Sequence, residues 1–212
     1  METTRLIAIR HGETAWNVDT RIQGQLDIGL NERGQWQARQ AARALAEEPI
    51  AAIYSSDLSR AFDTARAIGA VVGPEPEPHL GLSERAFGMF EGRTWAEIEA
   101  QWPEDTRRWR DREPGWAPTH GETLEQVRDR VALATEALAA RHRGEQIVLV
   151  AHGGVMDALY RLATQQPMQA PRSWSLGNAA INRLLWSPQG LTLVGWGDTR
   201  HLEDAALDES ST

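Results

Sequence analysis

Short runs of apolar residues alternate with amphipathic segments along most of the chain. Residues 6–9 and 147–151 are continuous apolar runs of strand length, which is typical of fully buried strands in a parallel sheet. Elsewhere, apolar residues recur at the spacing of one helix face, as expected of helices that pack on a sheet. The pattern predicts strands at 6–9, 50–54 and 147–151, a hairpin of 181–186 and 191–196, and helices at 31–48, 58–68, 94–102, 104–112, 124–138 and 155–163.

Turn and capping signals complete this outline. Ser56 or Asp57 is the expected N-cap of the helix that follows the second strand, because both side chains can accept a hydrogen bond from a helix amide. Residues 12–30 are polar and contain glycine, which indicates a long functional loop. The proline-rich segment 73–78 cannot be helical and predicts a loop or an edge strand.

The alternation of strands and helices predicts a single α/β domain. At roughly 100–200 residues per domain, a chain of 212 residues corresponds to one domain. Buried strands with helices between them favour a sandwich of helices around a mostly parallel sheet. Residues 82–120 are rich in Trp and Gly, and we expect them to form an insertion that covers the active site, not a separate domain. We therefore predict one domain over 1–212, with an acidic, frayed tail from Glu203.

The composition removes several kinds of chemistry. The chain has no cysteine, which excludes disulfides, thiolate metal sites and a cysteine nucleophile. It has no lysine, so all 22 basic residues are arginine and a P-loop or Schiff-base lysine is excluded. The net charge of −8 argues against nucleic acid or an anionic membrane as a partner. Because of this negative charge, we expect any bound anion to be held by a local cluster of arginines. No apolar run has the length of a signal-peptide core or a membrane span, so we expect a cytoplasmic protein.

Two histidine–glycine pairs follow the most apolar predicted strands. His11 ends the first run and His152 ends the run at 147–151. Ligands of open α/β sheets bind at the carboxyl ends of the strands, so we expect both rings to face one crevice. Zinc binding is one interpretation of such a pair. Arg10 lies beside His11, and Arg60 is expected on the first turn of a helix. These cations disfavour a metal dication and favour a phosphoryl group.

Four short blocks of the sequence carry a family resemblance. They are RHGETAWN at 10–17, SSDLSRA at 55–61, LSERAFGMFEG at 82–92 and VAHGG at 150–154. In this order they resemble the histidine phosphatase superfamily, the phosphoglycerate-mutase-like proteins. Each block alone is moderately specific, whereas four blocks in order are a strong indication.

The resemblance implies a three-layer α/β/α sandwich and a reaction through a phosphohistidine. His11 is then the nucleophile, while Arg10, Arg60 and His152 bind the phosphoryl oxygens and neutralise the charge of the transition state. Glu84 protonates the leaving alkoxide and later acts as the base for water. No metal or other cofactor is implied, because the arginines take the place of magnesium. Implied substrate-binding residues are Asn17, Gln23, Gly24, Gly153 and His120, which replaces a glycine of the family pattern, and Trp116 is a candidate for the mouth of the pocket.

Three functions are compatible with this resemblance. The segment 87–98 is similar to the broad-specificity phosphatase branch, which favours a phosphatase. A cofactor-dependent phosphoglycerate mutase is less favoured, because the chain is shorter and lacks the Tyr- and Lys-containing stretch of those enzymes. A non-catalytic phosphate-binding scaffold is disfavoured, because all five catalytic positions are filled. We predict a metal-independent phosphomonoesterase for small phosphorylated metabolites; the sequence leaves the substrate and a homodimeric assembly open.

Overall fold

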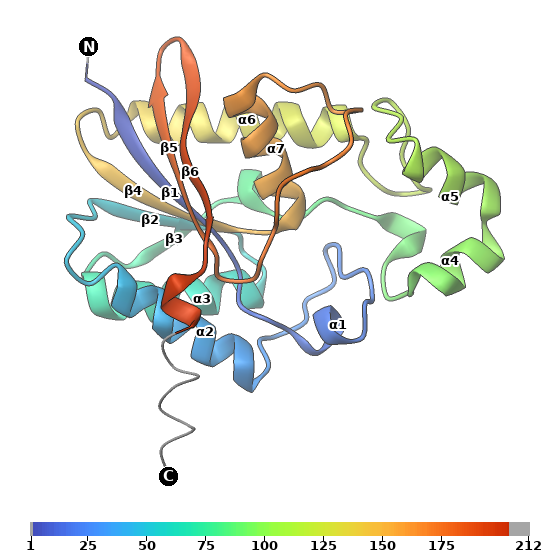
Figure 1. Cartoon of the computed structure of the whole chain (residues 1–212), viewed down its shortest axis with the longest axis horizontal. Coiled ribbons are helices and arrows are strands. Elements are labelled where there is room, and N and C mark those ends of the chain that lie inside the picture. Colours follow the sequence, from blue (N-terminus) through green and yellow to red (C-terminus); the bar gives the residue numbers. More distant parts are fainter. Residues whose placement is uncertain (1, 204–212) are drawn as a thin grey trace.

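A six-stranded sheet forms the centre of the molecule (Figure 1). The computed structural model describes residues 2–203. The strand order is β3-β2-β4-β1-β5-β6, in which β1 to β4 are parallel and β5 pairs antiparallel with both β1 and β6. The predicted, mostly parallel sheet is therefore confirmed. The strands are β1 (Thr4–Arg10), β2 (Ala52–Ser55), β3 (Pro76–Pro78), β4 (Gln146–Ala151), β5 (Ile181–Ser187) and β6 (Gly190–Asp198).

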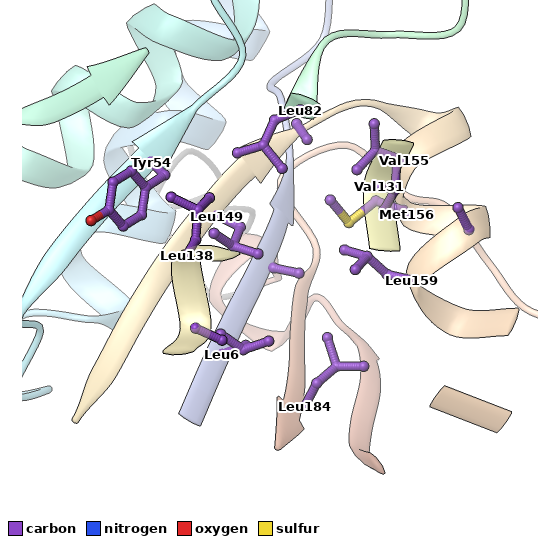
Figure 2. Packing of buried hydrophobic residues seen from close by; sticks show 14 of the residues in the cluster. Leu6, Tyr54, Leu82, Val131, Leu138, Leu149, Val155, Met156, Leu159 and Leu184 are labelled. Atoms are coloured by element: carbon purple, nitrogen blue, oxygen red, sulfur yellow. The ribbon is translucent and has the colours of Figure 1, made fainter. Parts of the chain in front are cut away.

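Helices cover both faces of this sheet. Side chains alternate along a strand, so Leu6 and Ala8 of β1 belong to one hydrophobic core and Ile7 and Ile9 to the other. Figure 2 shows the first core, in which Leu6 shares the packing with Leu184. The first core is closed by α6 (Leu124–Ala140) and α7 (Gly153–Thr164), and the second by α2 (Glu32–Ala44) and α3 (Ser59–Val72). This arrangement confirms the three-layer sandwich.

The Trp-rich segment 82–120 has a small core of its own. Phe90, Ile98 and Trp116 are buried together, and the rings of Trp102 and Trp109 pack against them. In Figure 1 this segment lies beyond the end of the sheet, on the side of α1. Its helices are α4 (Trp95–Gln101) and α5 (Pro103–Arg110), preceded by the 3-10 turns η1 (Leu80–Leu82) and η2 (Gly88–Phe90); α1 (Ala15–Val18) and η3 (Arg200–Leu202) are the remaining short elements.

Some predicted boundaries and caps are wrong. Neither Ser56 nor Asp57 caps α3; its N-cap is Leu58, which makes no side-chain capping bond. The amide of Ser59 instead donates to Asp27 Oδ1 at 2.8 Å. A residue 32 positions away therefore supplies the acceptor, and local spacing could not reveal it. Helix α7 begins two residues earlier than predicted, α1 lies unpredicted within the long loop, and most of the predicted frayed tail lies outside the described residues.

The central strand should dominate stability. Leu149 of β4 is fully buried in the first core, so Leu149→Ala should lower the free energy of unfolding by about 2–5 kcal/mol. Val194 on the edge strand β6 is 59% exposed, and Val194→Ala should change it by less than about 0.5 kcal/mol. Chemical denaturation of both variants measures the difference. Equal losses would contradict this packing.

Candidate active site

The parallel pairing of β1 with β4 brings the two predicted histidines together. Arg10 and Ala151 are register partners at the ends of these strands, and the amide of His11 donates to the Ala151 carbonyl at 2.9 Å. The next residues, His11 and His152, consequently lie ring to ring, with their centroids 5.1 Å apart. Both side chains are buried. The structure therefore brings the two imidazoles together, whereas only His11 is among the residues that line the cavity described below.

The backbone fixes the chemical form of His11. Its Nδ1 lies 2.6 Å from the Gly12 carbonyl oxygen, so Nδ1 carries a proton and donates it there, and Nε2 keeps its lone pair. Burial lowers the pKa of His11 well below its ordinary value of 6.5, and the charges of Arg10 and Arg60 lower it further. His11 is therefore a neutral imidazole at pH 7 with a free nucleophilic nitrogen.

Glycine is required beside this histidine. A Cβ on Gly12 would lie 2.4 Å from the Gly34 carbonyl oxygen at the start of α2. The Gly12 amide donates to Thr64 Oγ1 of α3 at 3.1 Å. Asn178, before β5, donates through Nδ2 to the His11 carbonyl at 2.9 Å. The His11 loop is thus held from three elements that are distant in sequence.

Three residues around His11 carry buried polar atoms that lack a hydrogen-bond partner among the described residues. These atoms are Nε of Arg10, Nε of Arg60, and both ring nitrogens of His152. Buried polar groups are nearly always hydrogen-bonded, because an unpaired one costs free energy. Burial also lowers the pKa of His152 well below 6.5, with the neighbouring cations adding to the shift. The arrangement fits an oxyanion that would accept hydrogen bonds from these groups.

Arg60 is positioned by the long loop. It stands on the first turn of α3 and is fully buried. Its two terminal nitrogens donate to the carbonyls of Gly24 at 2.7 Å and Leu26 at 2.8 Å. Burial lowers the pKa of Arg60, as it does that of Arg10. Arg10 donates through Nη1 to the carbonyl of Leu176. Both guanidinium groups are therefore held in place before any ligand arrives.

Glu84 approaches the same place from the segment after η1. Its Oε1 accepts hydrogen bonds from the amides of Arg85 at 2.7 Å and Gly154 at 3.1 Å. A Cβ on Gly154 would lie 2.4 Å from that oxygen, so glycine is required here for close approach of the carboxylate. Gly154 of the fourth block therefore makes room for the Glu84 carboxylate.

A cavity of about 940 Å³ opens from this group of residues. His11, Arg10, Arg60 and Glu84 line it, and His152 is not part of the lining. The predicted substrate-binding residues Asn17, Gln23, Gly24 and Gly153 line it too.

Two predicted contacts do not reach the cavity. His120 is exposed on a turn with a φ of 64°, outside the lining. Trp116 is buried in the core of the Trp-rich segment, and Trp95 and Trp109 line the cavity instead. Within residues 2–203 there is no group of three or more His, Asp or Glu side chains that could hold a metal ion.

Several lining or supporting residues escaped the sequence reasoning. Asn178 and Asp157 give no local signal, because their contacts depend on the fold. Arg85 directly follows Glu84 in the third block, and Arg172 follows Pro171 in the loop after α7. A search for arginines within the family blocks would have found Arg85.

Comparison with known proteins identifies the family. The model of the histidine phosphatase superfamily (branch 1) matches residues 6–199, so the chain belongs to that superfamily. It is 35% identical to Phosphoglycerate mutase-like protein 4 of Arabidopsis thaliana, over 99% of this chain and 92% of that protein. It is 38% identical to the Metal-independent phosphoserine phosphatase of the same plant, over 97% of this chain and 86% of that protein.

A solved structure supports the same class. The mycobacterial glucosyl-3-phosphoglycerate phosphatase in complex with VO3 superposes with a TM-score of 0.82 at 35% identity, covering 92% of this chain and 99% of that one. The predicted family, fold and enzyme class are confirmed: the chain is a phosphatase of the histidine phosphatase superfamily. No helix among residues 2–203 has the length and apolar character needed to cross a membrane.

The buried histidines should make the fold sensitive to acid. Between pH 6.5 and 5 the unfolded chain protonates histidines that the folded site keeps neutral, so the free energy of unfolding falls as the pH falls. His152→Gln should reduce this slope by up to about 1.4 kcal/mol per pH unit. Denaturation at several pH values in phosphate-free buffer measures it, with His120→Asn as the exposed control. An unchanged slope in His152→Gln would show that His152 protonates normally in the folded protein.

Proposed function

We propose that this protein is a metal-independent phosphomonoesterase that transfers the phosphoryl group of a small metabolite to His11 and then to water. The observation that carries the proposal is the neutral, oriented imidazole of His11 among unpartnered donors of Arg10, Arg60 and His152. Phosphoryl transfer needs positioning and charge stabilisation above all, and these groups supply both.

In the first half-reaction the phosphate dianion lies between the guanidinium groups of Arg10 and Arg60. The lone pair on His11 Nε2 attacks phosphorus while the bond from phosphorus to the ester oxygen breaks. Glu84 gives a proton to the leaving oxygen, so the product is a neutral alcohol. The products of this step are the alcohol, a phosphohistidine and a Glu84 carboxylate.

In the second half-reaction Glu84 acts in reverse. Its carboxylate takes a proton from water as the water oxygen attacks phosphorus and the bond from phosphorus to Nε2 breaks. His11 returns to its neutral form, because Nδ1 has kept its proton on the Gly12 carbonyl throughout. The arginines stabilise the equatorial oxygens in both steps. Inorganic phosphate leaves, and the enzyme is restored.

The same reasoning bears on where and on what the enzyme acts. The net charge of −8 with a local arginine cluster supports a small anionic metabolite and not nucleic acid as the substrate. The absence of cysteine accords with a reducing compartment, and we propose that the reaction takes place in the cytoplasm. Relatives named for phosphoserine and glucosyl-3-phosphoglycerate support phosphorylated small molecules as the substrate class.

The covalent intermediate can be trapped. Rapid quench of the wild type with a 32P-labelled monoester, in the presence of EDTA, should yield protein-bound label that is stable in base and lost in acid, as for a phosphohistidine. His11→Ala should trap none, whereas His120→Asn, changed outside the cavity, should trap as much as the wild type. Label that persists in His11→Ala would assign the nucleophile to another residue.

The role of Glu84 as the proton donor can be tested with substrates whose leaving groups differ in basicity. Glu84→Gln keeps the size of the side chain and removes its proton, so turnover of an alkyl phosphate should fall by about 10²–10⁴-fold. With p-nitrophenyl phosphate the leaving group needs little protonation, and the variant should give a burst of nitrophenol followed by slow turnover. Glu136→Gln, exposed on α6, is the control. If the rate of phosphohistidine formation fell equally with both substrates, Glu84 would have a substrate-binding or structural role and would not be the proton donor.

A further inference from the structure

Glu84 stands on a stretch of chain that no helix or strand supports. Residues 83–86 lie between η1 and η2 without regular structure. A proton donor must lie within hydrogen-bond reach of the atom that takes its proton, so the backbone that carries it has to be fixed. The side chains that fix this stretch on both sides of Glu84 are Arg130, on α6, and Glu122, just before that helix.

Arg130 holds the chain before Glu84. Its Nη1 donates to the carbonyl of Gly81 at 3.1 Å and to that of Ser83 at 2.9 Å. The hydroxyl of Ser83 donates in turn to Asp57 Oδ1 at 2.8 Å. The residue that directly precedes Glu84 is therefore held through its backbone and through its side chain.

Glu122 holds the chain after Glu84. Its Oε2 accepts a hydrogen bond from the Ala86 amide at 2.9 Å, and its own amide donates to the Ala86 carbonyl at 2.8 Å. Its carbonyl accepts a hydrogen bond from Arg85 Nε at 2.9 Å. One residue thus makes three hydrogen bonds to the two residues that follow Glu84.

Arg130 and Glu122 are themselves joined as a bidentate ion pair. Arg130 Nε lies 3.0 Å from Glu122 Oε1, and Nη2 lies 2.9 Å from Oε2. The two side chains are only 23% and 22% exposed. A planar guanidinium that meets both oxygens of a carboxylate fixes the orientation of the two groups as well as their distance. The Ser83 carbonyl and the Ala86 amide are consequently held relative to each other, with Glu84 between them.

This ion pair lies outside the cavity of the phosphoryl site. Neither Arg130 nor Glu122 is among the residues that line that cavity. Both line a second cavity of about 380 Å³, together with Ser83 and Gln25. Gln25 adds one contact to the same stretch, from its Nε2 to the Glu84 carbonyl at 3.1 Å. The pair therefore acts on the backbone of Glu84 and not on a ligand in the phosphoryl site.

We propose that Arg130 and Glu122 are a positioning pair, which fixes the backbone on both sides of Glu84 and so holds its carboxyl group where it exchanges a proton with the ester oxygen and with water. This inference rests on the proposed function, because it concerns the residue that transfers the proton there. The transfer of the phosphoryl group to His11 does not itself need the pair, since Arg10, Arg60 and His11 are held by other contacts.

Substrates with different leaving groups test this role. Arg130→Gln should lower kcat for an alkyl phosphate by about 10–10²-fold, because a displacement of about 1 Å has an effect of this size on a positioned group. The burst of nitrophenol from p-nitrophenyl phosphate should keep a rate close to that of the wild type, since this leaving group needs little protonation. Glu122→Gln, which keeps the size of the side chain, should show the same pattern. Arg128→Gln, also on α6 and paired with the exposed Asp129 at 2.7 Å, is the matched control and should behave as the wild type.

Combined variants show whether the pair acts through Glu84. In a Glu84→Gln background, Arg130→Gln should cause no further loss of kcat with the alkyl phosphate, because the group that it positions has already lost its proton. Arg130→Gln and Glu122→Gln together should lose little more than either alone, because each breaks the same unit. Arg130→Lys should recover only part of the activity, because its ammonium group keeps the charge but lacks the planar fork.

Three other results would overturn the inference. A further loss from Arg130→Gln in the Glu84→Gln background would show that Arg130 acts independently of Glu84. Full activity in Arg130→Lys would assign its effect to charge, and an equal fall of the nitrophenol burst in Arg130→Gln and in Glu122→Gln would show a general structural role. Wild-type turnover of the alkyl phosphate by Glu84→Gln would remove Glu84 as the proton donor and this inference with it, whereas trapped label on His11 in the same preparation would leave the proposed phosphatase reaction standing.

Discussion

The parallel pairing of β1 with β4 is the constraint on which the site depends. It sets Arg10 opposite Ala151, so that the residues after both strands leave the sheet at one point. The pairing of the two strands alone therefore makes the two histidines neighbours, and no additional contact between the His11 and His152 loops is needed. Shifting the register by one residue would turn every side chain of β1 to the other face and exchange the cores that Leu6 and Ile7 occupy. Packing in the two hydrophobic cores therefore fixes the β1–β4 register that brings the catalytic histidines together.

That point of the sheet is electrostatically unfavourable before a ligand binds. Arg60 and the two imidazoles are buried beside the half-buried Arg10. Desolvation lowers the pKa of all four groups, which favours their uncharged forms. The imidazoles respond by remaining neutral, which is the form a nucleophile and a hydrogen-bond donor need. The guanidinium groups remain charged, and backbone carbonyls such as that of Gly24 solvate them in part. Desolvation and repulsion of these clustered groups lower the stability of the fold, and apolar burial in the two cores of the sheet compensates for the loss.

The sequence predicted the parts of the site that arise from local rules. His11, His152 and Arg10 follow apolar strands, and a parallel sheet brings such strand ends together. Arg60 follows from its place at the start of a helix. Glu84 was reached only through the family resemblance, because nothing local places a loop carboxylate against the Gly154 amide. Supports that join distant segments, such as Asn178 on the His11 carbonyl, have no sequence signal at all.

The residues that line the cavity come from two different parts of the fold. Arg10, His11 and Arg60 stand at a strand end and a helix start that the cores fix, whereas Glu84 and most of the outer lining come from the Trp-rich segment and the loop after α7. Arg112 joins these two parts, donating to Asp157 of α7 and to the Met168 carbonyl at 2.8 Å each. Arg112 therefore ties the Trp-rich segment to α7 and to the loop that follows it. Changes in either loop can alter which alcohol is admitted while the register of the two histidines stays as β1 and β4 impose it.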